Sequence, residues 1–503
     1  MIRQVLLWHR PPGFRRAAWW TVLIVVATLV LIPRLRVIDG AVLTDGHAIL
    51  SLDMAMNRVF CGVSSAYSST ARVPMALSAN TGRRHRPLRA LLEEQAGTVD
   101  AYCRSIDTPY VNSENALMVI DTLILSAMPA LSLSQVGQVL FLVKAAGLVV
   151  FVLLLMDLGA SVALGFATFV CGLMLLHEMP DYVYSNYPFL FVMVLVAVAL
   201  HGFAVAYRWT GSAQGLILYG LAAGGLSATM ANLRTSYLPV AVALFLTVLV
   251  DELRRRGRPA GMRPGILRCG ALAGCFLAGY LAIDQGVIAS QLPKDGRFDA
   301  AHPFGHPLVL ALAVPESPFS REQKITWADD AGPRIAERVE PGVPYLGPRY
   351  NAAMLRYYSM LWKTRSREMA TVYILKFSTA GADMLRVMRA APGMAGAGVR
   401  ILLAPLGILP NGIWFLGLLV ILTAGSLTYY WRSNVPAAFA FGLLSLAACL
   451  VQLESAIIFS VFVKQYHNYA AFYVLFLSLA GVQAIANGVQ AWTAGAVDGA
   501  GRA

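Results

Sequence analysis

Long apolar runs recur along the chain, and they constrain its fold more than any other feature. A run of about twenty such residues can cross the hydrocarbon core of a bilayer as a helix. Of the 503 residues, 57% are hydrophobic and 13% are charged, which excludes a soluble enzyme or a nucleic-acid-binding protein. The sequence therefore predicts an all-α polytopic membrane protein with about ten transmembrane helices, over residues 17–33, 136–156, 160–177, 187–207, 213–230, 236–250, 265–285, 400–423, 436–458 and 469–491.

Basic residues at two places predict the orientation of the chain in the membrane. Residues 1–16 carry four arginines and no small-residue cleavage site follows the first span, so we expect a retained anchor with a cytoplasmic N-terminus. Six spans later the arginine-rich loop 251–264 falls on the same side. We therefore expect a bacterial inner-membrane protein with two long periplasmic loops, at 34–135 and 286–399, helical blocks at 136–285 and 400–491, and a cytoplasmic tail at 492–503.

The first candidate chemical group is Asp45, just beyond the first span. After it, Ala48, Leu52 and Ala55 share one face of a short predicted helix. Asp45 is then either the N-cap of that helix or a carboxylate at the membrane surface that acts as a general base.

The same loop ends with a second carboxylate, Glu114, close to Asn112 and Ser113 at another predicted helix start. Capping by Asn112 or Ser113 is the ordinary interpretation. The alternative is that Glu114 assists the general base, by orienting the molecule that accepts the transferred group or by binding a divalent cation.

The second outer loop contains His302 and His306, each followed by a proline. The prolines argue against a regular helix, and so against a metal pair at this spacing. We expect either a packed loop or an extended rim whose imidazoles donate to phosphate or sugar oxygens. Farther on, Tyr345 and Tyr350 beside Arg349 form a turn-rich strip that suits sugar stacking or serves as a connector.

From residue 351 the pattern becomes helical, amphipathic and basic. Basic helices with aromatic residues lie in the plane of the membrane surface against anionic head groups. We expect this of two stretches, and packing on the first outer loop is the alternative. Their apolar sides are formed by Met354, Leu355, Tyr358, Leu361 and Trp362, and by Tyr373, Ile374, Phe377, Met384, Leu385 and Met388.

Polar groups at the ends of the predicted spans are a further set of candidates, because burying a charge there is expensive. Arg234, Lys464 and His467 lie in outer turns and can converge on one phosphate, or they extend to ordinary head groups. Tyr187, in the outer turn before the fourth predicted span, would add an aromatic side chain to the lining of such a site. Asp284, near the end of the seventh predicted span, and Glu454, within the ninth, are intramembrane acids to test.

The arrangement resembles the multi-pass glycosyltransferases of the GT-C fold, which use polyprenyl-phosphate-linked sugars on the outer face of the membrane. The resemblance rests on Thr44-Asp45-Gly46-His47 after the first span, on the outer turns with Arg234 and Lys464, and on the large late outer loop. In that family an acidic pair is common where Asp45-Gly46 stands here. Asp39 and Asp53 therefore stay open as alternatives for the base.

The resemblance implies an inverting transfer of sugar to a lipid, glycan or protein acceptor of the cell envelope. Asp45 would take the proton of the acceptor, while Arg234, Lys464 and His467 would hold the departing lipid phosphate. It requires no organic cofactor, and whether a divalent cation takes part stays open. Anionic lipids are the other expected partners.

Two other functions stay open from the sequence. A non-catalytic lipid-binding or envelope-assembly protein would carry the same basic outer helices. A transporter needs ionisable groups deep within its spans, whereas we expect the charges of this chain almost wholly at the surface. The six cysteines show no metal-site spacing, and a bridge between Cys61 and Cys103 is left open.

Overall fold

The computed structural model describes residues 46–63, 82–106, 115–158, 160, 162–178, 186–206, 212–234, 237–256, 262–291, 304–345, 348–390 and 436–457, with isolated positions at 22, 25, 29, 414, 417, 420–421, 423–427 and 472. Within these residues the regular elements are helices, and no strand occurs. Pro87 and Ser132 form one isolated antiparallel bridge. The predicted all-helical class is confirmed for this part of the chain.

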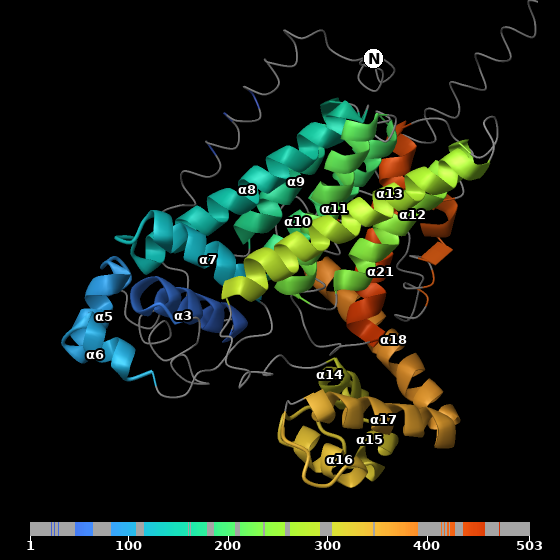
Figure 1. Cartoon of the computed structure of the whole chain (residues 1–503). Coiled ribbons are helices and arrows are strands. Elements are labelled where there is room, and N and C mark those ends of the chain that lie inside the picture. The colour runs from blue at the N-terminus through green and yellow to red at the C-terminus, as the bar shows by residue number, and fades with distance from the viewer. Residues whose placement is uncertain are drawn as a thin grey trace, which may run out of the picture.

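Of the helices that the structure describes, seven form a bundle, in the upper part of Figure 1. They correspond to seven of the ten predicted spans, and the other three fall largely outside the described residues. The helices are α8 (Leu133–Asp157), α9 (Val162–Glu178), α10 (Asn186–Ala206), α11 (Ala213–Leu233), α12 (Leu238–Arg256), α13 (Met262–Leu281) and α21 (Pro436–Ile457). Among the described residues, four segments are long and apolar enough to cross a membrane, namely Leu133–Asp157, Tyr187–Val205, Ala213–Leu233 and Gly265–Gln291.

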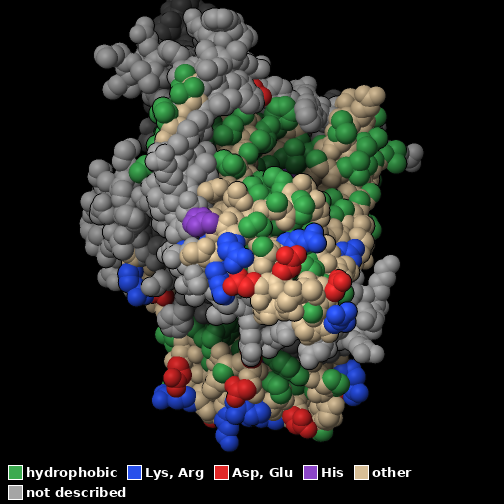
Figure 2. Space-filling view, turned by 90° about the vertical axis from the view of Figure 1, so that its left-hand side faces the viewer, with side chains coloured by type: hydrophobic (Ala, Val, Ile, Leu, Met, Phe, Trp, Pro, Cys, Tyr) green, Lys and Arg blue, Asp and Glu red, His purple; other side chains and the backbone are tan. Residues whose placement is uncertain are grey.

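Apolar side chains also cover much of the outside of this bundle. Leu218 of α11 and Leu267 of α13 are 62% and 75% exposed, and other large apolar residues of α8 and α12 are exposed as well. Figure 2 shows hydrophobic side chains in the upper part of the molecule and charged ones gathered below them. An apolar exterior of this kind suits a lipid environment.

Small residues allow α11 and α13 to pack backbone against backbone. Gly220 and Gly224 of α11 face the main chain of α13, and Gly279 of α13 faces Leu221 in return. A Cβ atom at any of the three would overlap the opposite helix. This close approach is the small-residue packing that membrane helices use.

Four helices of the predicted first outer loop join the lower end of the bundle. They are α3 (Gly46–Cys61), α5 (Leu88–Ala96), α6 (Val99–Arg104) and α7 (Asn115–Ala127). Leu52 and Met56 of α3 and Leu117 of α7 belong to the same buried cluster as the bundle helices, so this segment shares the main core.

A disulfide joins Cys61, the last residue of α3, to Cys103 in α6. Beside it, the buried Tyr102 hydroxyl donates a hydrogen bond of 3.0 Å to Oδ1 of Asn57. The pairing that the sequence leaves open is therefore present, and it fixes α6 against the end of α3.

The predicted second outer loop contains a small helical domain with a core of its own. It comprises α14 (Gly305–Leu310), α15 (Pro318–Glu322), α16 (Ala331–Val339), α17 (Pro348–Thr364) and the start of α18 (Ser366–Ala390). Met354 and Leu361 of α17 are buried in this core. The predicted placement of Met354 and Leu361 at the membrane surface is therefore wrong, because α14 and α16 pack on α17 and these side chains are buried, whereas Trp362 of the same predicted side is 38% exposed.

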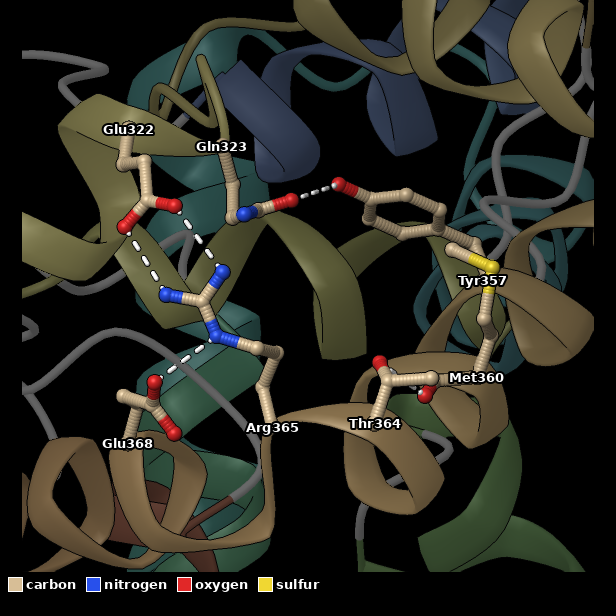
Figure 3. Close-up of polar contacts among 7 residues, drawn as sticks. All are labelled: Glu322, Gln323, Tyr357, Met360, Thr364, Arg365 and Glu368. Carbon is tan, nitrogen blue, oxygen red and sulfur yellow. Dashed lines mark hydrogen bonds and ion pairs between the residues drawn. The ribbon is translucent and has the colours of Figure 1, made fainter.

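The junction between α17 and α18 is held by Arg365. Its guanidinium donates 2.9 Å hydrogen bonds to both carboxylate oxygens of Glu322 on α15, and its Nε donates to Glu368 at 2.7 Å (Figure 3). From there α18 runs towards the bundle and contacts α21 (Figure 1). The bidentate pair thus orients the small domain on the helix that connects it to the bundle.

Candidate functional site at the lower end of the bundle

Two residues that the sequence analysis named separately meet at the lower end of the bundle. Arg234 follows α11 directly, and Tyr187 lies in the first turn of α10. An Nη1 atom of Arg234 donates a 2.8 Å hydrogen bond to the Tyr187 hydroxyl, and the guanidinium carbon lies 5.2 Å from the centre of the tyrosine ring. The ring and hydroxyl together orient the cation.

The backbone explains why Arg234 is placed there. Helix α11 ends at Leu233, and Arg234 is extended, with φ −163° and ψ 123°. Its N–H still donates to Met230 O, and its carbonyl accepts from the Tyr237 N–H at 3.0 Å. The main chain is thus anchored on both sides of the turn, and Arg234 is held at the end of α11.

A carboxylate lies on the opposite side of the same helix end. Asp284 belongs to the π-helix η4 (Ala282–Ile288) that continues α13. Its Oδ1 accepts a 2.8 Å hydrogen bond from Asn232 Nδ2, and its Oδ2 accepts one of 2.6 Å from Gln285 Nε2. Asn232 is two residues before Arg234. The end of α11 therefore carries both the amide that holds the Asp284 carboxylate and the Arg234 cation.

Ionisable residues buried among the helices were missed by sequence reasoning. Asp121 of α7 and Lys144 of α8 are 2% and 1% exposed, and their charges interact. Lys144 Nζ also lies 4.6 Å from the centre of the Phe189 ring. The expectation that charges stay almost wholly at the surface is therefore wrong. The single lysine within the apolar run 136–156 was the sequence feature that could have indicated a buried charge.

Asp53, one of the three candidates for the base, lies on α3 and is fully buried. The other two, Asp39 and Asp45, lie outside the described residues, as does Glu114. The described part of helix α3 runs from Gly46, so the predicted capping position at Asp45 lies outside the described residues. Helices α3 and α7, whose described residues follow Asp45 and Glu114 in the chain, pack against each other.

His306 is not part of an extended rim. It is the second residue of α14 and is 3% exposed. Its Nδ1 is 2.6 Å from the Tyr350 hydroxyl and its Nε2 is 3.2 Å from Oδ1 of Asp329. Of the two alternatives, His306 follows the packed one. The argument against a regular helix is wrong, because Pro307 falls in the first turn of α14, where a helix does not need the missing N–H.

Burial explains the electrostatics of His306. Removal from water lowers the pKa of its imidazole, and the hydrogen bond and charge of Asp329 only partly oppose this. Tyr350 is fully buried beside it, so the predicted sugar stacking on Tyr350 is also wrong. Arg349 is paired with Glu340, whose pKa is lowered chiefly by that hydrogen bond. His306 and Tyr350 therefore belong to the interior of the small domain.

His302, Lys464 and His467 lie outside the described residues. Among the residues that the structure describes, no group of three His, Cys, Asp or Glu side chains is arranged to hold a metal ion. Comparison of the chain with known protein families, with curated proteins and with solved structures found no match.

Proposed function

We propose that this protein is a membrane glycosyltransferase that moves a sugar from a polyprenyl-phosphate donor to an envelope acceptor on the outer face of the membrane. The observation that carries the proposal is the guanidinium of Arg234, held on Tyr187 at the end of an apolar bundle. An oriented cation at that level suits the phosphate of a lipid whose chain lies in the bilayer.

The Cys61–Cys103 disulfide supports the orientation in which this end of the bundle faces outward. Structural disulfides form in oxidising compartments, such as the bacterial periplasm. The bridge joins α3 to α6, and α3 packs on α7 at the same end as Arg234. The donor and acceptor would then meet on the periplasmic side.

In the proposed reaction the acceptor oxygen forms a bond to the anomeric carbon of the sugar, and the bond from that carbon to the phosphate oxygen breaks. Asp45 takes the acceptor proton, with Glu114 as its helper. The leaving lipid phosphate keeps the electron pair and is stabilised by Arg234, together with Lys464 and His467.

The proposal is tested by comparing wild type with Asp45→Asn and Arg234→Ala. Purified full-length chains are assayed for binding and turnover of a panel of polyprenyl-phosphate sugars. We expect Asp45→Asn to bind the lipid and lose transfer, and Arg234→Ala to bind it more weakly. Asp100→Asn on α6 removes an exposed carboxylate from the same outer segment and serves as the matched control. Failure of wild type to bind any of these lipids contradicts the proposal.

Unchanged turnover in Asp45→Asn, with transfer present in wild type, moves the base to Asp39 or Asp53. If wild type binds the lipid without transferring sugar, the non-catalytic assembly function replaces the enzyme.

A transporter is the second candidate, and the buried Asp121 and Lys144 favour it, because ionisable groups within a bundle commonly mark transport pathways. It predicts movement of the lipid-linked sugar across proteoliposome membranes that is lost in Lys144→Met protein whose helix content equals that of wild type.

A further inference from the structure

Exposed apolar side chains gather where α17 meets α18, at the edge of the small domain. Trp362 of α17 and Ile374 and Leu375 of α18 are exposed, and Ile374 reaches 58%. The Trp362 ring stacks on the Tyr373 ring, with centres 5.8 Å apart and planes 13° from parallel. Because Tyr373 precedes Ile374 in the chain, the stack joins the exposed residues of the two helices. Trp362, Tyr373, Ile374 and Leu375 together form the corner patch.

The aromatic part of the corner patch is held in place from the inside. The hydroxyl groups of Tyr373 and Tyr358 are hydrogen-bonded to each other. Lys376 is fully buried, and its Nζ lies 5.4 Å from the centre of the Tyr373 ring. Aromatic side chains that are already ordered lose little entropy when they bind. Tryptophan and tyrosine are also the residues enriched at the boundary between water and lipid.

Positive charge lies beside the corner patch. Lys363 is next to the patch on α17, and Arg367 lies on the exposed side of α18 that carries the patch isoleucine, seven residues before it. Two acids of this region, Glu322 and Glu368, are both paired with Arg365. These five side chains leave the corner with an excess of positive charge.

A groove of about 440 Å³ continues this surface along α17. It is lined by Leu355, Arg356, Ser359, Met360, Lys363 and Thr364. Leu355 and Met360 supply apolar surface, and Lys363 and Arg356 supply positive charge. Arg356 shares the carboxylate of Glu340 with Arg349, so positive charge is in excess here as well. Apolar surface next to cations is the combination that membrane-surface helices present to phospholipids.

The corner patch lies at the end of the molecule where the small domain joins the bundle. Helix α18 runs from the corner to the bundle and contacts α21. In Figure 1, α17 lies nearer to the bundle than α16 does. Ile374 is eight residues from the start of α18, which corresponds to about 12 Å along the helix towards the bundle.

The charge of the corner selects among its candidate partners. An anionic bilayer presents phosphates at its surface with hydrocarbon directly beneath, which matches cations beside aromatic and aliphatic side chains. A second copy of the chain would bring the same excess of positive charge to the contact. Like charges placed opposite each other oppose association. The observations therefore favour a lipid surface over a dimer.

We propose that the corner patch rests on the bilayer surface and that Lys363 and Arg367 bind the phosphates of anionic phospholipids there. Trp362 and Ile374 enter the boundary between head groups and acyl chains. The exposed basic side of α17 meets the membrane, while Met354 and Leu361 stay in the core of the small domain. The contact fixes the small domain relative to the bilayer and does not depend on sugar transfer.

The test places the photo-crosslinking amino acid benzoylphenylalanine at residue 371 or at residue 359 of the full-length chain. Thr371 is exposed between Arg367 and Ile374, and Ser359 is exposed in the groove. The protein is reconstituted in nanodiscs that contain equal amounts of phosphatidylcholine and phosphatidylglycerol. After irradiation, adducts are identified by mass spectrometry. A probe in place of Arg334, which is exposed on α16, is the positional control.

We expect lipid adducts from residues 371 and 359 and none from residue 334. Phosphatidylglycerol should exceed phosphatidylcholine in the adducts, because it is anionic. Lys363→Gln and Arg367→Gln should each lower this ratio by about fivefold, the usual effect of one basic residue near an anionic surface. Arg334→Gln removes the same charge from α16 and should leave the ratio unchanged.

Four results overturn the inference. The first is the absence of lipid adducts at both residues 371 and 359, and the second is an equal yield of lipid adducts at residue 334. The third is a phosphatidylglycerol ratio that Lys363→Gln and Arg367→Gln leave unchanged. The fourth is crosslinking between two copies of the chain in place of lipid, which would assign the corner patch to a dimer. None of these results bears on Arg234 or on sugar transfer.

Discussion

Gly224 of α11 lies so close to Phe276 of α13 that a side chain at residue 224 would overlap the carbonyl oxygen of Phe276. Because both groups belong to helix backbones, neither can move aside cheaply. We expect Gly224→Ala to destabilise the protein by about 1–3 kcal/mol, the usual range for overpacking, and Gly224→Leu by more. Thermal unfolding of the purified chain in detergent measures this.

Gly274 provides the control for that experiment. It is also in α13, but among the described residues no heavy atom lies within 4 Å of the place where its Cβ would be. Gly274→Ala should therefore be neutral or stabilising, because alanine favours a helix. Equal effects at residues 224 and 274 would show that close packing is not what requires glycine.

The buried charges of Asp121 and Lys144 depend on each other. Removing one leaves the other without its opposite charge in the core, which destabilises the folded chain. We therefore expect Lys144→Met and Asp121→Leu each to lower stability strongly, and the double variant to recover most of the loss. A double-mutant cycle from thermal unfolding gives the coupling. Additive losses would contradict an interaction between the two charges.

His306 should make the stability of the small domain depend on pH. Its pKa is lowered in the folded protein, so between that value and the ordinary value of about 6.5 the unfolded chain binds more protons. The neutral imidazole therefore makes its full contribution to stability above about pH 6.5. This contribution is lost as the pH falls through the pKa that His306 has in the folded protein. Pulse proteolysis of the full chain, followed by mass spectrometry of residues 304–372, measures it.

His306→Gln should remove this pH dependence, whereas His85→Gln, which replaces an exposed histidine, should keep it. The lowered pKa of Glu322, caused chiefly by its hydrogen bond with Arg365, acts in a separate window, because its contribution is lost only below about pH 4.3. If the stability of the small domain in His306→Gln still depended on pH above pH 5, another group would be responsible for the titration.

The disulfide joins positions 42 residues apart. Closing a loop of this length in the unfolded chain corresponds to about 4 kcal/mol in the chain-entropy treatment. We expect Cys61→Ser, Cys103→Ser and the double variant to lose similar amounts. Thermal unfolding of oxidised and reduced wild type provides the comparison, and a double variant as stable as oxidised wild type would show that the bridge adds nothing.

Local patterns predicted the helices well. The apolar runs located α8 to α13 and α21 within a few residues, because length and periodicity are properties of a short segment. The number of spans in the whole chain stays a prediction.

Contacts between distant segments were not predictable in the same way. Arg234 and Tyr187 were both named from the sequence, but their pairing across 47 positions depends on how α10 packs against α11. His306 was misinterpreted because its partner Tyr350 is 44 residues away, and because Pro307 was taken to prevent a helix that it begins. Lys144 was overlooked because one charge barely alters a long apolar run.

The bridge between Cys61 and Cys103 also determines the product of proteolytic cleavage in this segment. A protease that cuts between these two residues would leave two fragments still joined by a covalent bond, with α3 and α6 on opposite sides of the cut. The nicked protein would travel as one molecule until a reductant reached the bond. Separation of the two fragments would then require two separate chemical events, hydrolysis and reduction.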